Sequence, residues 1–146
     1  MPQLLSPEDR EYLTKEFEKL TRDVPITVVT HESALVVAGE EVPYGKEVKE
    51  IMTELASLSP HIKLTVEDVL PSQTDKLSAL RVERLPAIVL GERQRYYGLP
   101  AGYEFSTMIA AILDLGSDAS PLKPEVAQKL GELKQNVHIQ VFVTPT

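Results

Sequence analysis

The sequence predicts an α/β domain in which a mixed sheet is flanked by helices, with an extra N-terminal helix and a C-terminal helix-strand extension. Helical and strand patterns alternate over the first half of the chain, which favours a parallel β-α-β unit. Two apolar runs joined by a short glycine-containing turn then predict a β-hairpin. The chain has 146 residues, 42% hydrophobic and 25% charged, which is enough to bury a core without a disulfide or a metal.

The first half of the chain contains two helical and two strand patterns. Ser6-Pro7 provides an N-cap serine followed by a proline, and the apolar stripe after it predicts a helix to about Arg22-Asp23. The β-branched run 26–30 predicts a central strand. A second helical pattern follows Val42-Pro43, and the alternation over 62–66 predicts a half-buried strand.

Residues 32–41 separate the first strand from the second helix and allow two interpretations. The apolar run 34–38 is either a short strand or a buried loop, because its length and composition fit both. The adjacent acids Glu40 and Glu41 are expected to face water, so we assign them no catalytic role.

The second half of the chain predicts a hairpin between two helices. Residues 75–82 form a short helical pattern, 86–90 an apolar strand and 95–97 the beginning of its hairpin partner. A third major helix is expected over 103–115, with one face on the sheet.

The last thirty residues contain a further helix and strand pattern. A polar run with turn chemistry precedes a helical pattern over 124–135. Residues 137–143 alternate apolar and polar side chains, which predicts a strand.

Charge and hydropathy restrict the partners. The net charge is −7 and no basic stripe is present, so nucleic acid is not an expected partner. No apolar run approaches the roughly 20 residues of a membrane-spanning helix, and no signal peptide is visible. We therefore expect a soluble, cytoplasmic protein with no membrane partner.

The chain offers no obvious catalytic chemistry of its own. It contains no cysteine, and His31, His61 and His138 lack metal-ligand spacing, so neither a metal nor another cofactor is expected. No nucleophile-base pair is visible, and no catalytic residue is assigned. The chain alone is not expected to be an enzyme.

Three segments resemble one known family. They are the hairpin-to-helix run 95–105, the sequence Leu85-Pro86-Ala87 and the run 140–146. Together they resemble the tandem thioredoxin-fold protein disulfide oxidoreductases, also called glutaredoxin-like proteins, over nearly the whole chain. The resemblance implies a thioredoxin-like fold, a role in redox homeostasis, and a cis-proline loop at Leu85 and Pro86.

The sequence departs from that family at two places. Residues 32–41 resemble an insertion, and Val42-Pro43-Tyr44-Gly45 stands where the family has its first Cys-x-x-Cys at the opening of a helix. Hydroxyls and glycine cannot replace a thiolate nucleophile and a resolving thiol, so the motif is interpreted as degenerate.

The resemblance implies that residues 1–116 are a redox-inactive unit and that 117–146 are the linker, helix and first strand of a following thioredoxin-like unit. The chain would support, or present substrate to, a C-terminal Cys-x-x-Cys domain of the same parent protein, which would be a disulfide oxidoreductase. Protein or peptide substrates and a second copy of the chain are further candidate partners.

Two alternatives remain open. The flavoprotein subunit of alkyl hydroperoxide reductase also begins with two thioredoxin folds, of which the first lacks cysteines, and its first unit is similar around the Gly-Leu-Pro turn. A stand-alone peptide-binding module predicts an open groove between Pro86 and the helix end at Val42, which residues 34–37 would have to leave free.

Overall fold

A four-stranded mixed sheet forms the centre of the computed structural model, which describes residues 4–32 and 38–143. The strands are β1 (Val24–Thr30), β2 (Ile62–Asp68), β3 (Ala87–Leu90) and β4 (Gln94–Tyr97), in the order β2-β1-β3-β4. β1 is parallel to β2 and antiparallel to β3, and β4 is antiparallel to β3. The predicted β-α-β unit, the hairpin and the central position of β1 are therefore confirmed.

Helices cover the two faces of this sheet unequally. α1 (Pro7–Phe17), α2 (Gly45–Ala56) and α4 (Tyr103–Leu115) contribute to the larger core on one face. The short helix α3 (Thr74–Leu80) packs on the other face, where Leu77 joins a smaller cluster. The predicted bounds of α4 agree with the structure at both ends.

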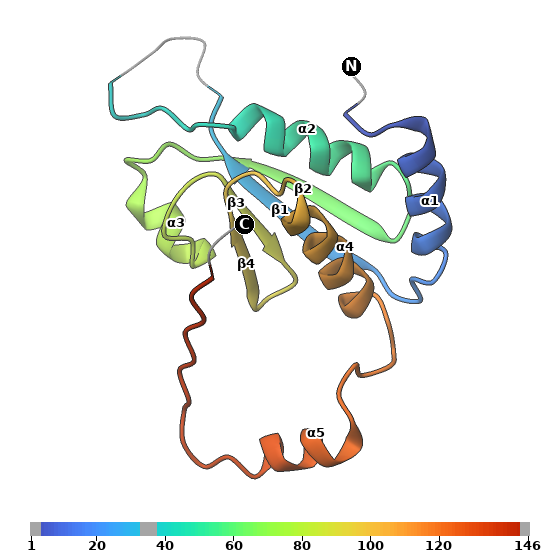
Figure 1. The fold of residues 1–146 in the computed structure, drawn as a ribbon. Helices are drawn as coiled ribbons and strands as arrows, with labels where there is room; N and C mark the ends of the chain where they lie inside the picture. The colour runs from blue at the N-terminus through green and yellow to red at the C-terminus, as the bar shows by residue number, and fades with distance from the viewer. Residues whose placement is uncertain (1–3, 33–37, 144–146) are drawn as a thin grey trace.

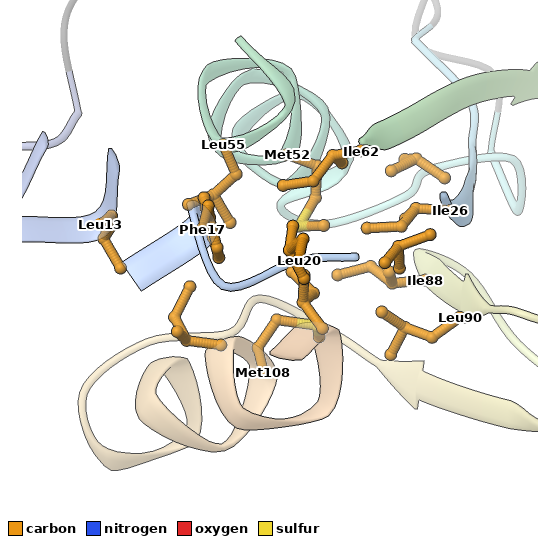
Figure 2. Packing of buried hydrophobic residues seen from close by; sticks show 14 of the residues in the cluster. Leu13, Phe17, Leu20, Ile26, Met52, Leu55, Ile62, Ile88, Leu90 and Met108 are labelled. Atoms are coloured by element: carbon orange, nitrogen blue, oxygen red, sulfur yellow. The ribbon is translucent and has the colours of Figure 1, made fainter. Parts of the chain in front are cut away.

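The larger core lies between the helices and the inner face of the sheet. Figure 2 shows Phe17, Met52 and Met108 from three helices facing Ile26 and Ile88 of the central strands. All five side chains are at most 2% exposed. Burial of these apolar side chains is the main source of stability and fixes the carboxyl end of β1 against the start of α2.

The first helix is shorter than the sequence pattern predicts. α1 begins after its N-cap Ser6, as expected, but it ends at Phe17 and not near Arg22. The carbonyl of Gly116 accepts hydrogen bonds from the amides of Thr21 and Arg22, at 2.8 and 3.1 Å. These bonds turn the chain out of the helix, while Leu20 remains buried without helical geometry.

The C-terminal part differs most from the prediction. α5 (Pro124–Gly131) contains no buried residue, and it ends before Gln135, the predicted limit. The strand predicted over 137–143 is wrong, because these residues have no regular secondary structure, are exposed and lie outside the sheet. A strand needs a neighbour to hydrogen-bond with, and no described strand lies beside this segment. Figure 1 shows α5 lying away from the sheet.

Two further points concern expected segments. Most of the apolar run 34–38 lies outside the described residues, and only its last residue, Ala38, is described, in a turn. Within the residues that the structure describes, none of the helices has the length and hydropathy needed to cross a bilayer.

Candidate functional site

The predicted site residues meet at one end of the sheet. β1 ends at Thr30, and the pairing of Val29 with Ala87 in the neighbouring strand brings Pro86 beside that end. The Leu85-Pro86 peptide bond is cis, and the carbonyl of Pro86 accepts a hydrogen bond of 3.0 Å from the amide of Gly98. Pro86 is buried and Leu85 is half-buried.

The motif Val42-Pro43-Tyr44-Gly45 does not open the helix as the sequence predicts. α2 begins only at Gly45, and Tyr44 is its N-cap with φ of 62° in the left-handed region. The amide of Gly45 donates to the carbonyl of Val42 at 3.1 Å, which closes a turn before the helix. Val42 therefore lies ahead of the first helical turn, because the left-handed Tyr44 delays the helix by one tight turn.

The tightest approach in the site joins Gly45 to Thr30. A Cβ atom added to Gly45 would lie 2.3 Å from Thr30 Oγ1, 3.2 Å from Val42 Cγ1 and 3.4 Å from the carbonyl oxygen of His31. Thr30 is 2% exposed, and its hydroxyl has no hydrogen-bond partner among the described residues. The space that a side chain at position 45 would need is thus occupied by the hydroxyl of Thr30.

A cysteine at position 45 therefore cannot be accommodated unless Thr30 or the backbone moves. The sequence offered no signal for this contact, since glycine and threonine are both ordinary residues at the ends of such elements. The contact joins positions that lie fifteen residues apart in the sequence, so no local pattern reveals it.

Two of the three histidines lie beside different carboxylates, and the three do not gather. His31 Nδ1 lies 2.6 Å from Asp68 Oδ1, and His61 Nδ1 lies 3.1 Å from Asp23 Oδ1. His138 lies in the exposed C-terminal segment. No group of three potential metal ligands occurs in residues 4–32 and 38–143.

The carboxylates of Glu40 and Glu41 each accept a hydrogen bond from a backbone amide. Glu40 Oε2 accepts from the amide of Ser72 at 3.4 Å, and Glu41 Oε2 accepts from the amide of Gly39 at 3.2 Å. Both side chains therefore fasten loops.

The loop before Pro86 is fastened to β4 by residues that no sequence pattern singled out. The guanidinium of Arg84 lies 5.0 Å from the centre of the Tyr97 ring, a cation-π arrangement. The hydroxyl of Tyr97 accepts a hydrogen bond of 3.2 Å from the amide of Glu83. Arg95 donates to the carbonyls of Leu80 and Glu92. These contacts attach the end of α3 and the loop after it to β4.

The two adjacent tyrosines of β4 lie on opposite faces of the sheet. Tyr97 packs against the smaller cluster, and Tyr96 packs against the larger core. Burial raises the pKa of Tyr96, and so does its hydrogen bond to the carboxylate of Glu104. Tyr96 therefore stays a neutral phenol that ties β4 to the start of α4.

The structure resembles solved proteins with thioredoxin folds. It matches a protein disulfide oxidoreductase from Aeropyrum pernix with a TM-score of 0.74 and 25% identity, over 91% of this chain and 57% of that one. It matches the alkyl hydroperoxide reductase protein AhpF of Enterococcus faecalis with a TM-score of 0.72 and 23% identity, over 90% of this chain and 62% of that one. The fold is therefore α/β and thioredoxin-like.

Sequence comparison gives a consistent but partial likeness. The alkyl hydroperoxide reductase protein AhpF of Staphylococcus aureus is 26% identical over 102 residues, which are 70% of this chain and 18% of that protein. The chain thus spans less than a fifth of the length of the curated relatives it matches. No protein-family model matches the sequence. The chain is a cysteine-free, thioredoxin-like unit that resembles the N-terminal domain of AhpF and a tandem protein disulfide oxidoreductase.

Proposed function

We propose that this chain is the redox-inactive first unit of a two-unit thiol-disulfide oxidoreductase. Residues 1–116 form that unit, and residues 117–146 are the linker, helix and first strand of the next one, a strand that forms only when the rest of that unit is present to pair with it. The observation that carries the proposal is the contact between Thr30 and Gly45. The position of the second redox cysteine in active relatives is filled here by a buried hydroxyl, so the motif 42–45 is degenerate in its packing as well as its sequence.

The unit acts by interaction. Disulfide exchange needs a thiolate, and this chain has no cysteine. The loop at Leu85 and Pro86 is nevertheless firmly held, by Arg84 on Tyr97 and by the amide of Gly98 on Pro86. Such a loop offers backbone groups to an extended peptide, so the unit orients protein or peptide substrates for the catalytic unit that comes after it.

The C-terminal segment supports the proposed domain division. α5 begins with Pro124-Glu125 after its N-cap Lys123, as α1 begins with Pro7-Glu8 after Ser6, and an apolar alternation comes after each helix. In the first unit this alternation becomes the central strand β1. In the second case Val137, Ile139 and Val141 are 62 to 79% exposed, which leaves them available to a sheet formed by residues after Thr146.

Reduction of insulin disulfides with dithiothreitol tests the proposal. We expect no acceleration by residues 1–146, and acceleration by a longer chain that extends through the next unit. Replacing the cysteines of that next unit by serine should abolish the activity. Catalysis by residues 1–146, or activity of the longer chain that survives the serine substitutions, would contradict the proposal.

The curated relatives favour a second candidate, the first unit of a flavoprotein similar to the alkyl hydroperoxide reductase protein AhpF. The two candidates share the inert first unit and differ in the domains that come after it. Visible absorption of the purified longer protein separates them, because a bound flavin absorbs visible light and a disulfide oxidoreductase without cofactor does not.

A further inference from the structure

A groove runs along the outside of α4, between that helix and α1. It consists of two adjoining hollows of about 400 and 340 Å³, which share Asp9 and Phe105 as lining residues. The first hollow lies over the start of α4 at Gly102, and the second continues as far as Leu113. This stretch of α4 is about 16 Å long at 1.5 Å per residue.

The floor of the groove is apolar. Leu13 and Ile109 close it from below and are 4 and 8% exposed, while Phe105 and Leu113 are half-buried at its side. Tyr12 of α1 lines the opposite side of the groove and is 62% exposed. Apolar side chains thus line the groove along three turns of α4, and Tyr12, Phe105 and Leu113 keep part of their surface exposed.

The charges at the rim have one sign. Asp9, Glu16 and Glu47 line the two hollows, and no described lysine or arginine lines either of them. Glu16 pairs with Lys19 at 2.7 Å. Asp9 bonds to Ser6, and neither Asp9 nor Glu47 takes part in an ion pair among the described residues. The rim therefore attracts cations and repels acidic surfaces.

One wall of the groove is held in place by the half-buried carboxylate of Glu54. Glu54 Oε2 accepts hydrogen bonds from the amides of Leu4 and Leu5, at 2.8 and 3.2 Å, and Oε1 pairs with Arg10. Leu4 and Leu5 line the first hollow. Because these bonds fix the N-terminal segment against α2, the groove exists before any partner arrives.

We propose that this groove binds a cationic amphipathic helix of a partner protein. The shape favours a helix, because a third helix can lie between α1 and α4 at the usual spacing of about 8 to 10 Å. Phe105, Ile109 and Leu113 recur every four residues, which matches apolar anchors one turn apart on the partner. Lysine or arginine residues beside those anchors would then face Asp9 and Glu47.

This site is distinct from the one in the proposed function. The hollows share no lining residue with the motif 42–45 or with Leu85 and Pro86. A second copy of the chain is the competing occupant, because α5 carries Val126, Leu130 and Lys129 on an exposed helix. Peptide binding and sedimentation together separate the two occupants.

The probe is a synthetic helix of about 14 residues with leucine at every third or fourth position and lysine elsewhere. A twin peptide has glutamate in place of every lysine. Fluorescence anisotropy gives the dissociation constant of each peptide for the full chain, and amide chemical shifts locate the contact. We expect the lysine peptide to perturb amides of α1 and α4, and the glutamate twin not to bind.

Two pairs of variants test the groove. Ala110→Lys places an ammonium group in the lining of the groove and should weaken the lysine peptide about tenfold or more, while Ala79→Lys on exposed α3 should change binding less than about twofold. Glu47→Lys should weaken binding more than Glu125→Lys, which changes the net charge equally at the first turn of α5. Circular dichroism verifies that all four variants fold.

Three results would overturn the proposal. Equal binding of the lysine peptide to Ala110→Lys and Ala79→Lys would exclude the groove, and equal binding of the two peptides would exclude the charge preference. Self-association in sedimentation experiments that Ala110→Lys abolishes would assign the groove to a second copy. These measurements do not depend on disulfide exchange, so the groove proposal can stand or fail independently of the proposed function.

Discussion

The hydroxyl of Thr30 distinguishes this site from one that has merely lost its cysteines. A buried hydroxyl without a hydrogen-bond partner is costly, by about 1 to 3 kcal/mol. The residue nevertheless stands where a Cβ at position 45 would have to lie. Thr30 and Gly45 therefore form a packed pair, in which each residue restricts the other.

A double-mutant cycle tests this pairing. Gly45→Ala should reduce the free energy of unfolding by about 1 to 3 kcal/mol, because the added methyl group overlaps Thr30 Oγ1. In a Thr30→Ala background the same change should cost much less, which gives a coupling of about 1 to 2 kcal/mol. Urea denaturation of the four proteins measures the cycle.

Gly131→Ala is the matched control, because its added Cβ meets nothing within 4 Å. It should change the free energy of unfolding by less than about 0.5 kcal/mol. Additive costs for Thr30→Ala and Gly45→Ala would show that the two residues do not restrict each other.

Glu54 gives a second prediction for a single residue. Burial raises its pKa, but the amides of Leu4 and Leu5 and the guanidinium of Arg10 outweigh burial and bring the pKa below the ordinary 4.5. Glu54→Gln should therefore lower the free energy of unfolding at neutral pH by about 2 kcal/mol. Glu50→Gln, which breaks only a 3.8 Å pair with Lys46, should cost less than about 0.5 kcal/mol.

The pH dependence has a defined sign. The folded state binds the Glu54 proton less readily than the unfolded chain does, so this stabilisation is complete above pH 4.5 and declines as the pH falls through the lowered pKa. The difference between the wild-type chain and Glu54→Gln should shrink over that range. A difference that stays constant down to about pH 3 would contradict the assigned role of the carboxylate.

Among the secondary-structure elements, α5 and the chain after it contribute least to the domain. None of the residues of α5 is buried, and the last described contacts with the domain are those of Asp118 with Thr21 and Arg22. Truncation after Ala119 should therefore change the free energy of unfolding of the thioredoxin-like unit by less than about 0.5 kcal/mol.

Urea denaturation followed by far-ultraviolet circular dichroism measures this effect. Truncation after Leu115 is the control, because it removes the Gly116 carbonyl that accepts from Thr21 and Arg22. The free energy of unfolding of that shorter chain should be lower by at least about 1 kcal/mol. A large loss on truncation after Ala119 would mean that α5 packs on this unit.

The elements that the sequence predicted well are those whose pattern and neighbours agree. The bounds of α4 follow from an apolar stripe that reaches the sheet, and β1 is central because its β-branched residues are covered on both faces. The run 137–143 has an equally clear alternation but no described neighbour, so it forms no strand. An alternating sequence favours a strand, but the strand forms only where a neighbouring strand is present to pair with it.

The candidate site was predicted less completely than the fold. The positions of Leu85 and Pro86 and of the motif 42–45 came from a resemblance, whereas the left-handed Tyr44 and the Thr30–Gly45 contact depend on how β1 meets α2. The periodicity of the sequence does not predict how the end of β1 packs against the start of α2. The support of the loop by Arg84 was missed for the same reason.

At the scale of the whole molecule, one thioredoxin-like unit presents two separate surfaces. One is the end of the sheet with the degenerate motif and the proline loop, and the other is the acidic groove along α4. A unit without cysteines can still affect catalysis by holding a substrate near another active site. The central claim of the proposed function is that residues 1–116 contribute binding and not chemistry.

The most direct measurement compares the longer protein with and without residues 1–116, using insulin and a small aromatic disulfide as substrates. We expect that removing the unit raises KM for insulin severalfold, leaves kcat nearly unchanged, and has no effect on either constant for the small disulfide. An unchanged KM for insulin, or an equal loss of kcat with both substrates, would contradict the claim.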